Sequence, residues 1–264
     1  MSFHRQVTPV ILTYNEEANL DRTLPKLTWA ARVIAVDSGS TDRTLEICAS
    51  FPNINVVQRK FDSFSSQINH GVSLVSTEWV MVLGSDCFLT DEIISEIGQL
   101  TAAPDVSAYI ARFKYCINGR PLRASLYPAR ELIFRVNSGR YIEDGHGERL
   151  RVKGVSKQLT GWVYHDDRKP LGRWLSAQNK YASLECNKLL TAPVGELNIQ
   201  DRLRRRIYFA PLLVFFYLLF VRGLILDGWR GWFYVCQRTI AEILLSLRLL
   251  IERERLEPSG QVKE

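Results

Sequence analysis

The chain has 264 residues, of which 46% are hydrophobic and 23% charged, and this composition excludes a wholly disordered protein. The net charge of +6 is unevenly distributed, with −5 on residues 1–100, +7 on residues 101–198 and +4 on residues 199–264. The last two segments are basic, which favours an anionic partner for that part of the chain.

The cysteines and the N-terminal residues give information on the cellular compartment of the protein. The five cysteines are widely spaced and include no Cys-x-x-Cys pair, which argues against a disulfide framework and a thiolate zinc site. Residues 1–6 are polar and the apolar run after them has only strand length, so we expect no signal peptide. Both features are typical of a protein in a reducing cytoplasm.

The first hundred residues alternate between strand-like and helix-like patterns. Short β-rich runs predict buried parallel strands over residues 7–13, 32–38, 54–58 and 79–83. Helical spacing predicts helices over residues 17–27, 42–51, 64–75 and 91–100. Thr41 or Asp42 can cap the second helix, and Thr90 can cap the fourth. This alternation predicts a doubly wound α/β half with right-handed crossovers.

The pattern changes after residue 104. A strand over residues 108–117 followed by Asn118-Gly119 predicts a β-hairpin with a type I′ turn. Further strands are expected over residues 131–136 and 150–152, with a polar loop over residues 141–148 between them. A short apolar run over residues 162–165 ends in histidine, and residues 171–190 have helical spacing.

Two apolar segments occupy the C-terminal region. Residues 207–221 carry no charge, yet as a helix they would extend about 22 Å, short of the roughly 30 Å hydrocarbon core of a bilayer. Residues 229–251 have an apolar face rich in aromatics and an opposite face rich in arginine, typical of an interfacial helix. We expect these two helices to lie on a membrane surface, with the preceding Arg204-Arg205-Arg206 run beside anionic lipid; the alternative is that the helices cap the sheet.

Several nucleotide-binding and catalytic motifs are absent. The segment after the first strand contains no glycine, so the dinucleotide-binding fingerprint fails where it has to occur. No phosphate-binding G-x-x-x-x-G-K-[ST], no G-x-S-x-G and no H-E-x-x-H motif is present. Any nucleotide is therefore bound by another arrangement.

Polar side chains follow three of the predicted strands. Open α/β sheets bind ligands in the crevice beyond the carboxyl ends of their strands, so we expect these side chains to form one site. Asp37 can accept a hydrogen bond from a base or a ribose hydroxyl, and Asp86 can hold a hard divalent cation. The alternative is turn chemistry, since Asp-Ser-Gly-Ser-Thr-Asp is also an ordinary strand-to-helix turn. The candidate residues are Thr13, Tyr14, Asn15, Glu16, Asp37, Ser38, Ser40, Ser85 and Asp86.

Taken together, the strand-end segments resemble the successive motifs of family 2 inverting glycosyltransferases of GT-A fold. These segments are Tyr14-Asn15-Glu16-Glu17, Val36-Asp37-Ser38-Gly39-Ser40-Thr41-Asp42 and Leu83-Gly84-Ser85-Asp86. Within the family, the chain is similar to the lipopolysaccharide core β-1,4-glucosyltransferase type over nearly its whole length. That similarity includes Phe64-x-x-Gln67-x-Asn69, the Tyr115…Asn118-Gly119-Arg120 hairpin, and Arg222-Gly223…Leu226-Asp227-Gly228.

The resemblance implies a fold and a set of ligand contacts. The fold is GT-A, a Rossmann-like, mostly parallel sheet, here with a C-terminal pair of amphipathic interfacial helices. The strand-end residues together with Gln67 and Asn69 would bind a nucleotide-sugar donor, with UDP as the nucleotide. Asp86 and His165 would hold a divalent cation, Mg²⁺ or Mn²⁺, although a lone histidine can equally be structural.

Inversion in one step also needs a carboxylate base near the acceptor hydroxyl. The resemblance places Glu148 where the subgroup has the glutamate of a His-Glu pair, whereas Asp144 matches the Glu-Asp base of other family members. We favour Glu148 over Asp144. Several basic side chains in this half could meet acceptor phosphates or simply form a solvated face: Arg112, Lys114, Arg120, Arg123 and Arg130.

The sequence departs from the family pattern at three positions. Gly84 replaces the first aspartate of the Asp-x-Asp signature, which leaves one metal carboxylate where two are common. Ile68 replaces a lysine of the subgroup, and Gly147 replaces the histidine of the His-Glu pair. The departures indicate a divergent member and leave its metal dependence and donor sugar open.

On this basis three segments are expected: residues 1–104 for nucleotide-sugar binding, 105–198 for acceptor binding and the base, and 199–264 for membrane association. The predicted activity is inverting transfer of glucose or a related hexose to a lipid-linked or lipopolysaccharide acceptor at the cytoplasmic face of the inner membrane. No nucleic acid is expected as a partner. The alternatives are a polyprenyl-phosphate glycosyltransferase, whose relatives usually carry true membrane spans, and a non-catalytic nucleotide-sugar-binding scaffold.

Overall fold

The structure is a computed structural model that describes residues 2–101, 103–144, 147–193, 195 and 197–256. The chain divides into two compact units. The first contains residues up to 143 together with 147–169, and the second contains Asp144 and the residues from 170 onward. Each unit has its own core of buried side chains.

Four parallel strands form one part of the sheet in the first unit. They run in the order β3-β2-β1-β4, and their bounds are Ile54–Gln58 (β3), Val33–Asp37 (β2), Val7–Thr13 (β1) and Trp79–Gly84 (β4). The register pairs Thr13 with Asp37 and Leu12 with Gly84, so the carboxyl ends of β1, β2 and β4 lie side by side. These are the strands expected from the β-branched runs, and β1 and β3 have the predicted bounds.

The remaining strands continue the same nine-stranded sheet in the order β4-β8-β6-β11-β5. β8 is antiparallel to both β4 and β6, β11 is parallel to β6, and β5 is antiparallel to β11. Their bounds are Arg130–Arg135 (β8), Val106–Ile117 (β6), Val155–His165 (β11) and Cys87–Leu89 (β5). The register places His165 directly opposite Cys87, so the end of β11 lies beside the end of β4.

A short hairpin closes β6. The strand β7 (Arg120–Pro121) pairs with the end of β6. Asn118 and Gly119 between them have φ values of 50° and 76°, as the two central positions of a type I′ turn require. The turn predicted from Asn-Gly is therefore confirmed.

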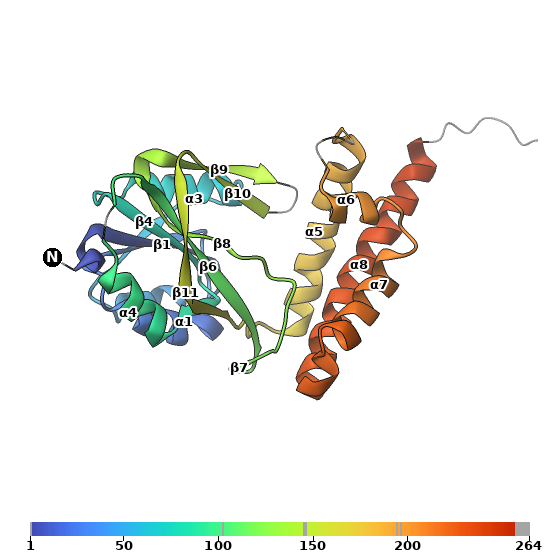
Figure 1. The fold of residues 1–264 in the computed structure, drawn as a ribbon, viewed down its shortest axis with the longest axis horizontal. Coiled ribbons are helices and arrows are strands. Elements are labelled where there is room, and N and C mark those ends of the chain that lie inside the picture. The colour runs from blue at the N-terminus through green and yellow to red at the C-terminus, as the bar shows by residue number, and fades with distance from the viewer. Residues whose placement is uncertain (1, 102, 145–146, 194, 196, 257–264) are drawn as a thin grey trace, which may run out of the picture. The chain divides into compact units, whose positions relative to one another are not determined.

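Helices cover both faces of the sheet (Figure 1). On one face, α3 (Phe64–Ser73) packs Ile68 and Val72 against β1 and β2. On the other face lie α1 (Glu17–Thr23) and α4 (Asp91–Gln99), with α2 (Thr44–Ala49) following β2. The short 3₁₀ turns of this unit are η1 (Phe3–Gln6), η2 (Leu24–Leu27) and η3 (Val136–Ser138). The predicted α/β fold class is confirmed.

Local capping agrees with the sequence at one helix and differs at another. The Thr90 hydroxyl accepts a hydrogen bond from the Ile93 backbone N–H at 3.4 Å, which confirms this residue as the cap of α4. For α2, the residue at the N-cap is Arg43, whose side chain makes no cap. Asp42 accepts from the Thr44 N–H at 3.0 Å instead, so the expected carboxylate acts one residue before the cap position.

Two predicted boundaries in the second half are wrong. The segment 141–148, expected as a loop, belongs to a two-stranded sheet of β9 (Gly139–Asp144) and β10 (Gly147–Val152), with residues 145 and 146 outside the described residues. Here the buried Tyr141 ring packs on Phe134, which ties the ribbon to the core. β11 is also longer than the predicted run 162–165, because its first residues pair with β6 through backbone groups while their side chains stay exposed.

The second unit is helical. Its elements are α5 (Leu171–Thr191), α6 (Ile199–Arg204), α7 (Ala210–Phe216), η5 (Tyr217–Val221, a π-helical turn), η6 (Leu224–Asp227) and α8 (Trp229–Leu256). The single helix expected over 207–221 therefore begins at Ala210, because Ile207 has a φ of 57°. The helices predicted at 171–190 and 229–251 are confirmed, with α8 extending to Leu256.

A buried ion cluster joins the helices of the second unit. Arg204 donates to both carboxylate oxygens of Glu242, at 2.5–3.1 Å, and lies 3.7 Å from a Glu185 oxygen. Burial lowers the pKa of Arg204, but the charges of Glu242, Glu185 and Asp201 raise it by more. The net pKa is therefore above the ordinary value and the guanidinium is charged. Arg204 thus holds α6 to α5 and α8, whereas the sequence suggested a position beside lipid.

Candidate functional site

The carboxyl ends of β1, β2 and β4 bring the predicted strand-end residues together. Asp37 is completely buried, and its Oδ1 accepts hydrogen bonds from the Thr13 and Ser40 hydroxyls at 2.9 and 2.5 Å. Its Oδ2 accepts from the backbone N–H groups of Gly39 and Ser40, both at 2.9 Å. Because a carboxylate offers about four acceptor positions, the protein itself engages all of them. Asp37 therefore shapes the loop that follows β2.

Asn15 ties the loop after β1 to the loop after β2. Its backbone N–H donates to the Ser40 hydroxyl at 2.9 Å, and its side-chain oxygen accepts from the Thr41 N–H at 2.7 Å. Asn15 has a φ of 54°, a left-handed conformation that asparagine adopts more readily than most residues. Tyr14, immediately before it, keeps about half of its surface exposed at this edge of the sheet.

Asp86 and His165 meet at the end of β4. The His165 Nε2 lies 3.2 Å from the Asp86 Oδ2, and the Cys87 Sγ lies 3.4 Å from the Asp86 Oδ1. Burial raises the pKa of Asp86, but the positive charges of His165 and Lys169 and the hydrogen bond from His165 lower it more, so the carboxyl is ionised. Conversely, burial lowers the pKa of His165, and Asp86 raises it above its ordinary value.

Aromatic stacking fixes the orientation of the His165 ring. The ring lies 4.7 Å from that of Tyr115 and 4.8 Å from that of Tyr127, measured between centroids. Its Nδ1 is buried and has no hydrogen-bond partner among the described residues. The two tyrosine rings therefore hold the imidazole in place without a hydrogen bond at its Nδ1 from the described residues.

The geometry of this pair fits a divalent cation. Two ligands at right angles around an ion about 2.1 Å away lie roughly 3 Å apart, close to the 3.2 Å between His165 Nε2 and Asp86 Oδ2. Within the described residues, Asp86, Cys87 and His165 form a group whose ligand atoms all lie within 4.8 Å of one another. A carboxylate oxygen with an imidazole nitrogen is a donor set that Mn²⁺ accepts.

The residues after β11 supply charged contacts that the sequence reading missed. Lys169 forms an ion pair with the buried Glu16, and burial together with the charge of Asp86 keeps the pKa of Glu16 above its usual value despite Lys169. Asp166, also buried, accepts from Arg22 at 2.6 Å, and its own backbone N–H donates to the Asp86 carbonyl at 2.9 Å. The dense run of charged residues directly after His165 was the available signal.

The two candidate bases have different surroundings. A Glu148 oxygen lies 3.4 Å from the Arg130 guanidinium, which is stacked 4.9 Å over the Tyr127 ring, and Tyr127 in turn contacts His165. Glu148 is therefore linked through two side chains to the Asp86–His165 pair. Asp144, by contrast, is 2.8 Å from the Lys188 ammonium of α5 and belongs to the second unit.

Of three other predicted residues, Gln67 and Ser85 lie near the strand ends, whereas Asn69 does not. Gln67 is buried, donates to the Ser38 hydroxyl at 3.1 Å and so joins the loop after β2. Ser85 is buried next to Asp86, and its carbonyl accepts from a threonine of α1. Asn69 instead exchanges hydrogen bonds of 2.9 and 3.1 Å with the backbone of Tyr141, because two residues along a helix point to nearly opposite sides. Asn69 thus lies outside the strand-end network.

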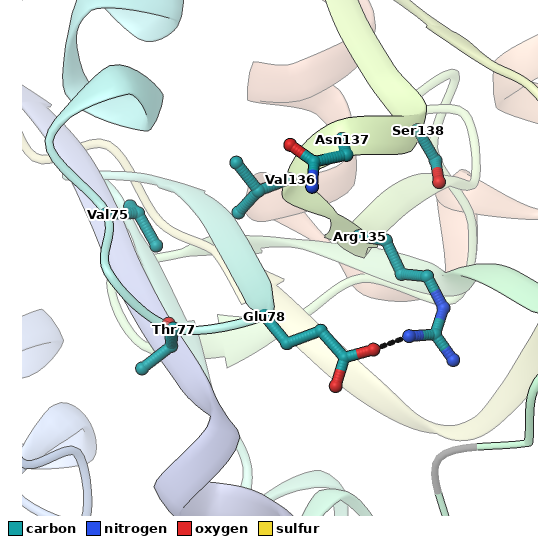
Figure 2. Close-up of a pocket in the computed structure, with 7 residues that line it drawn as sticks. All are labelled: Val75, Thr77, Glu78, Arg135, Val136, Asn137 and Ser138. Atoms are coloured by element: carbon teal, nitrogen blue, oxygen red, sulfur yellow. Dashed lines mark ion pairs between the residues drawn. The ribbon is translucent and has the colours of Figure 1, made fainter.

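A cavity of about 310 Å³ opens elsewhere, at the amino end of β4 (Figure 2). Its lining residues are Val75, Thr77, Glu78, Arg135, Val136, Asn137 and Ser138. Glu78 and Arg135 form an ion pair there, and the Arg135 guanidinium stacks 4.4 Å over the Trp79 ring. None of the predicted site residues lines this cavity, and its charged pair is already satisfied.

Residues 8–153 match the family model described as Glycosyl transferase family 2. The chain belongs to this family. It is accordingly a glycosyltransferase, and the matched segment includes the Asp37 loop, Asp86 and both candidate bases. The family assignment agrees with the resemblance drawn from the strand-end motifs.

Individual relatives of this glycosyltransferase are distant. It is 25% identical to the lipopolysaccharide core biosynthesis glycosyltransferase LpsC of Rhizobium meliloti (strain 1021), over 84% of this chain and 83% of that protein. It is 28% identical to an uncharacterized glycosyltransferase of Rickettsia bellii (strain RML369-C), over 40% of this chain and 36% of that one. The crystal structure of S. aureus TarS 1-349 aligns with a TM-score of 0.44 at 15% identity, covering 98% of this chain and 94% of that one.

The Asp37 loop of this glycosyltransferase gives a first prediction. We expect Asp37→Ala to weaken binding of uridine and of UDP by the same factor, about 10- to 150-fold, because the loop after β2 loses the hydrogen bonds that shape it. One hydrogen bond to a charged group contributes about 1.5–3 kcal/mol. Titration calorimetry with both ligands measures this, with Asp105→Ala, in an exposed turn, as the matched control. A loss confined to UDP would show that the loop after β2 meets the diphosphate and not the nucleoside, and unchanged affinities would leave the segment a turn.

Proposed function

We propose that this glycosyltransferase transfers a hexose from a UDP-sugar, with inversion, to a lipid-anchored saccharide such as a lipopolysaccharide core. The observation that carries the proposal is the Asp86–His165 pair beside the Asp37 loop, an ionised carboxylate and an imidazole at the crevice where α/β sheets bind ligands. The similarity to LpsC over most of both chains supports the acceptor class.

In the proposed site, Asp86 and His165 hold the Mg²⁺ or Mn²⁺ ion. When bound, such an ion supplies Lewis-acid stabilisation of the charge that develops on the leaving diphosphate. Thr13, Asn15 and Ser40 hold the two loops against each other, and Tyr14 offers an exposed ring for the nucleoside base. The Lys169 ammonium, near Asp86, adds positive charge where the diphosphate would bind.

Inversion requires a base on the acceptor side, and we assign this role to Glu148. Its pairing with Arg130 supports the assignment, because a guanidinium favours the ionised carboxylate that can accept a proton. The stacking of Arg130, Tyr127 and His165 gives Glu148 a fixed relation to the proposed metal site. Asp144, which pairs with Lys188 of α5, is the second choice.

The deciding experiment is a donor screen on the purified full chain. UDP-linked hexoses are compared with other nucleotide sugars by release of the nucleoside diphosphate, with Mn²⁺, with Mg²⁺ and with chelator. Each is measured with a lipopolysaccharide core acceptor, with polyprenyl phosphate, and without acceptor. We expect UDP release from one UDP-hexose that requires both the metal and the acceptor. Binding of UDP without release from any donor would support a scaffold, and transfer to polyprenyl phosphate would support the alternative enzyme.

A lipid-anchored acceptor lies at a membrane, and the second unit has an exposed apolar surface suited to binding there. Large apolar side chains of α7, η5, η6 and α8 are exposed, including Leu212, Phe216, Phe220, Leu226, Trp229, Trp232, Ile243 and Leu247, and so is Phe209 at the N-cap of α7. Arg206 and Arg222 are exposed next to them, and cations close to anionic lipid contribute about 1 kcal/mol each. Among the described helices, none has both the length and the apolar character needed to cross a bilayer. On the strength of the exposed apolar side chains and the arginines beside them, we propose peripheral binding at the cytoplasmic face of the inner membrane.

Vesicle sedimentation tests this surface. We expect the chain to sediment with vesicles containing anionic phospholipid at low salt, and the double variant Phe220→Asp/Trp229→Asp to remain in the supernatant. Charges in the exposed apolar face remove the burial that drives interfacial binding. Val155→Asp, an equally exposed apolar position of the sheet unit, is the control and should sediment like the original chain. Equal sedimentation of all three proteins would contradict the proposal.

A further inference from the structure

Cys87 lies on the same face of the sheet as His165. The two residues stand directly opposite each other in the antiparallel β5–β11 ladder, where facing side chains have Cβ atoms about 5 Å apart. The Cys87 Sγ is 3.4 Å from the Asp86 Oδ1, and its side chain is buried. The backbone register therefore brings a sulfur, a nitrogen and an oxygen atom within 4.8 Å of one another.

Gly84 is what leaves room for this arrangement. A Cβ atom at position 84 would lie 2.7 Å from the Asp86 Oδ1 and 3.3 Å from the Cys87 Sγ. An aspartate there, as in the family signature, would require the Asp86 carboxylate to shift from its present position. Glycine at position 84 thus removes one carboxylate of the family signature and also leaves space for the Asp86 carboxylate beside the Cys87 sulfur.

The donor set has a different chemical preference from a pair of carboxylates. Thiolate and imidazole ligands suit Zn²⁺ and other thiophilic ions, whereas Mg²⁺ takes oxygen ligands almost exclusively. We propose that Cys87 is a third protein ligand, so that Asp86, Cys87 and His165 bind Zn²⁺ or Cd²⁺ in preference to Mg²⁺. This inference rests on the proposed function only in taking Asp86 and His165 as metal ligands.

Coordination by Cys87 has a defined proton balance. As the bond from Sγ to the metal forms, the S–H bond breaks and its proton passes to solvent, because the thiolate is the ligand. The ion can approach from the side of Asp86, whose side chain is 25% exposed. Binding of Zn²⁺ or Cd²⁺ should therefore release a proton that binding of Mg²⁺ does not.

Cadmium titration of the full chain tests the proposal independently of activity. The exposed Cys236 is first replaced by serine, so that it adds no signal of its own. We expect ultraviolet sulfur-to-cadmium charge-transfer absorption that saturates at about one equivalent, is absent after Cys87→Ser, and persists after Cys116→Ser, a buried cysteine outside the cluster. In calorimetry, Cys87→Ser should weaken Zn²⁺ binding by at least about 10²-fold and change Mg²⁺ binding by less than about threefold.

The outcomes separate this inference from the proposed metal site. If Cys87→Ser binds Zn²⁺ and Cd²⁺ like the parent while Asp86→Asn binds neither, the inference is overturned and the Asp86–His165 site stands. If Asp86→Asn also keeps full affinity for Zn²⁺ and Mn²⁺, the proposed metal site fails as well. Thermal melting identifies a misfolded serine variant, and in that case Cys87→Ala provides the same comparison.

Discussion

Replacing Asp86 by asparagine is expected to lower the rate of sugar transfer by about 10³-fold or more, with the fold unchanged. A metal ion at a leaving group contributes several kcal/mol of transition-state stabilisation, and each 1.36 kcal/mol corresponds to a factor of ten. Asp86 is the carboxylate of the candidate site, and its side chain lies at the edge of the sheet outside the hydrophobic core. Diphosphate release under saturating Mn²⁺ measures the effect.

The Asp86→Asn experiment needs two controls. Asp105→Asn makes the same chemical change in the exposed turn before β6 and should keep full activity. Thermal melting should show that Asp86→Asn unfolds close to the temperature of the parent chain. A folded variant with near-normal transfer in saturating Mn²⁺ would remove Asp86 from the proposed mechanism.

Replacing Glu148 by glutamine should depress turnover by about 10²- to 10⁴-fold, the usual contribution of a general base. The amide keeps the size of the side chain but cannot accept the acceptor proton. Because Glu148 contacts Arg130 rather than the Asp37 loop, the affinity for UDP should change little. Steady-state kinetics with saturating donor, together with UDP calorimetry, separate these two quantities.

Asp144→Asn provides the matched comparison. It removes a carboxylate that pairs with Lys188, so we expect a small loss of stability and turnover within a few-fold of the parent. An inactive Asp144→Asn beside a fully active Glu148→Gln would reverse the order of the two candidates. Loss of activity in both variants, with the fold intact, would show that the reaction needs both carboxylates and that Glu148 does not act alone.

The predictions were confirmed for features that depend on neighbouring residues, such as strands, a turn and a helix cap. The parallel strands are predictable because runs of β-branched residues favour a sheet, and β1 and β3 have the expected bounds. The expected burial holds for β1, whereas no residue of β3 is buried because it is the last strand of the sheet. The Asn118-Gly119 turn and the Thr90 cap depend only on neighbouring residues, and both are present. The strand-end rule also placed Asp37 and Asp86 at one edge of the sheet, because parallel strands share their direction.

The errors arise where pairing depends on distant backbone or on the environment of a charge. The first residues of β11 are polar and exposed, so their hydrophobicity gave no strand signal, although their backbone pairs with β6. Arg204 belongs to a run of arginines that predicted contact with lipid. Its guanidinium is instead buried against Glu242, a residue 38 positions away.

The sequence by itself determined the fold class, the family and the residues at the strand ends, because each depends on periodicity or on a short contiguous motif. Only the tertiary structure placed Lys169 against Glu16, 153 residues apart, and Cys87 opposite His165. It also distinguished Gln67, which joins the Asp37 loop, from Asn69, which binds the backbone of β9. The physical reason is that strand register and side-chain packing are set by the whole core, whereas propensity and motif spacing are properties of a few neighbouring residues.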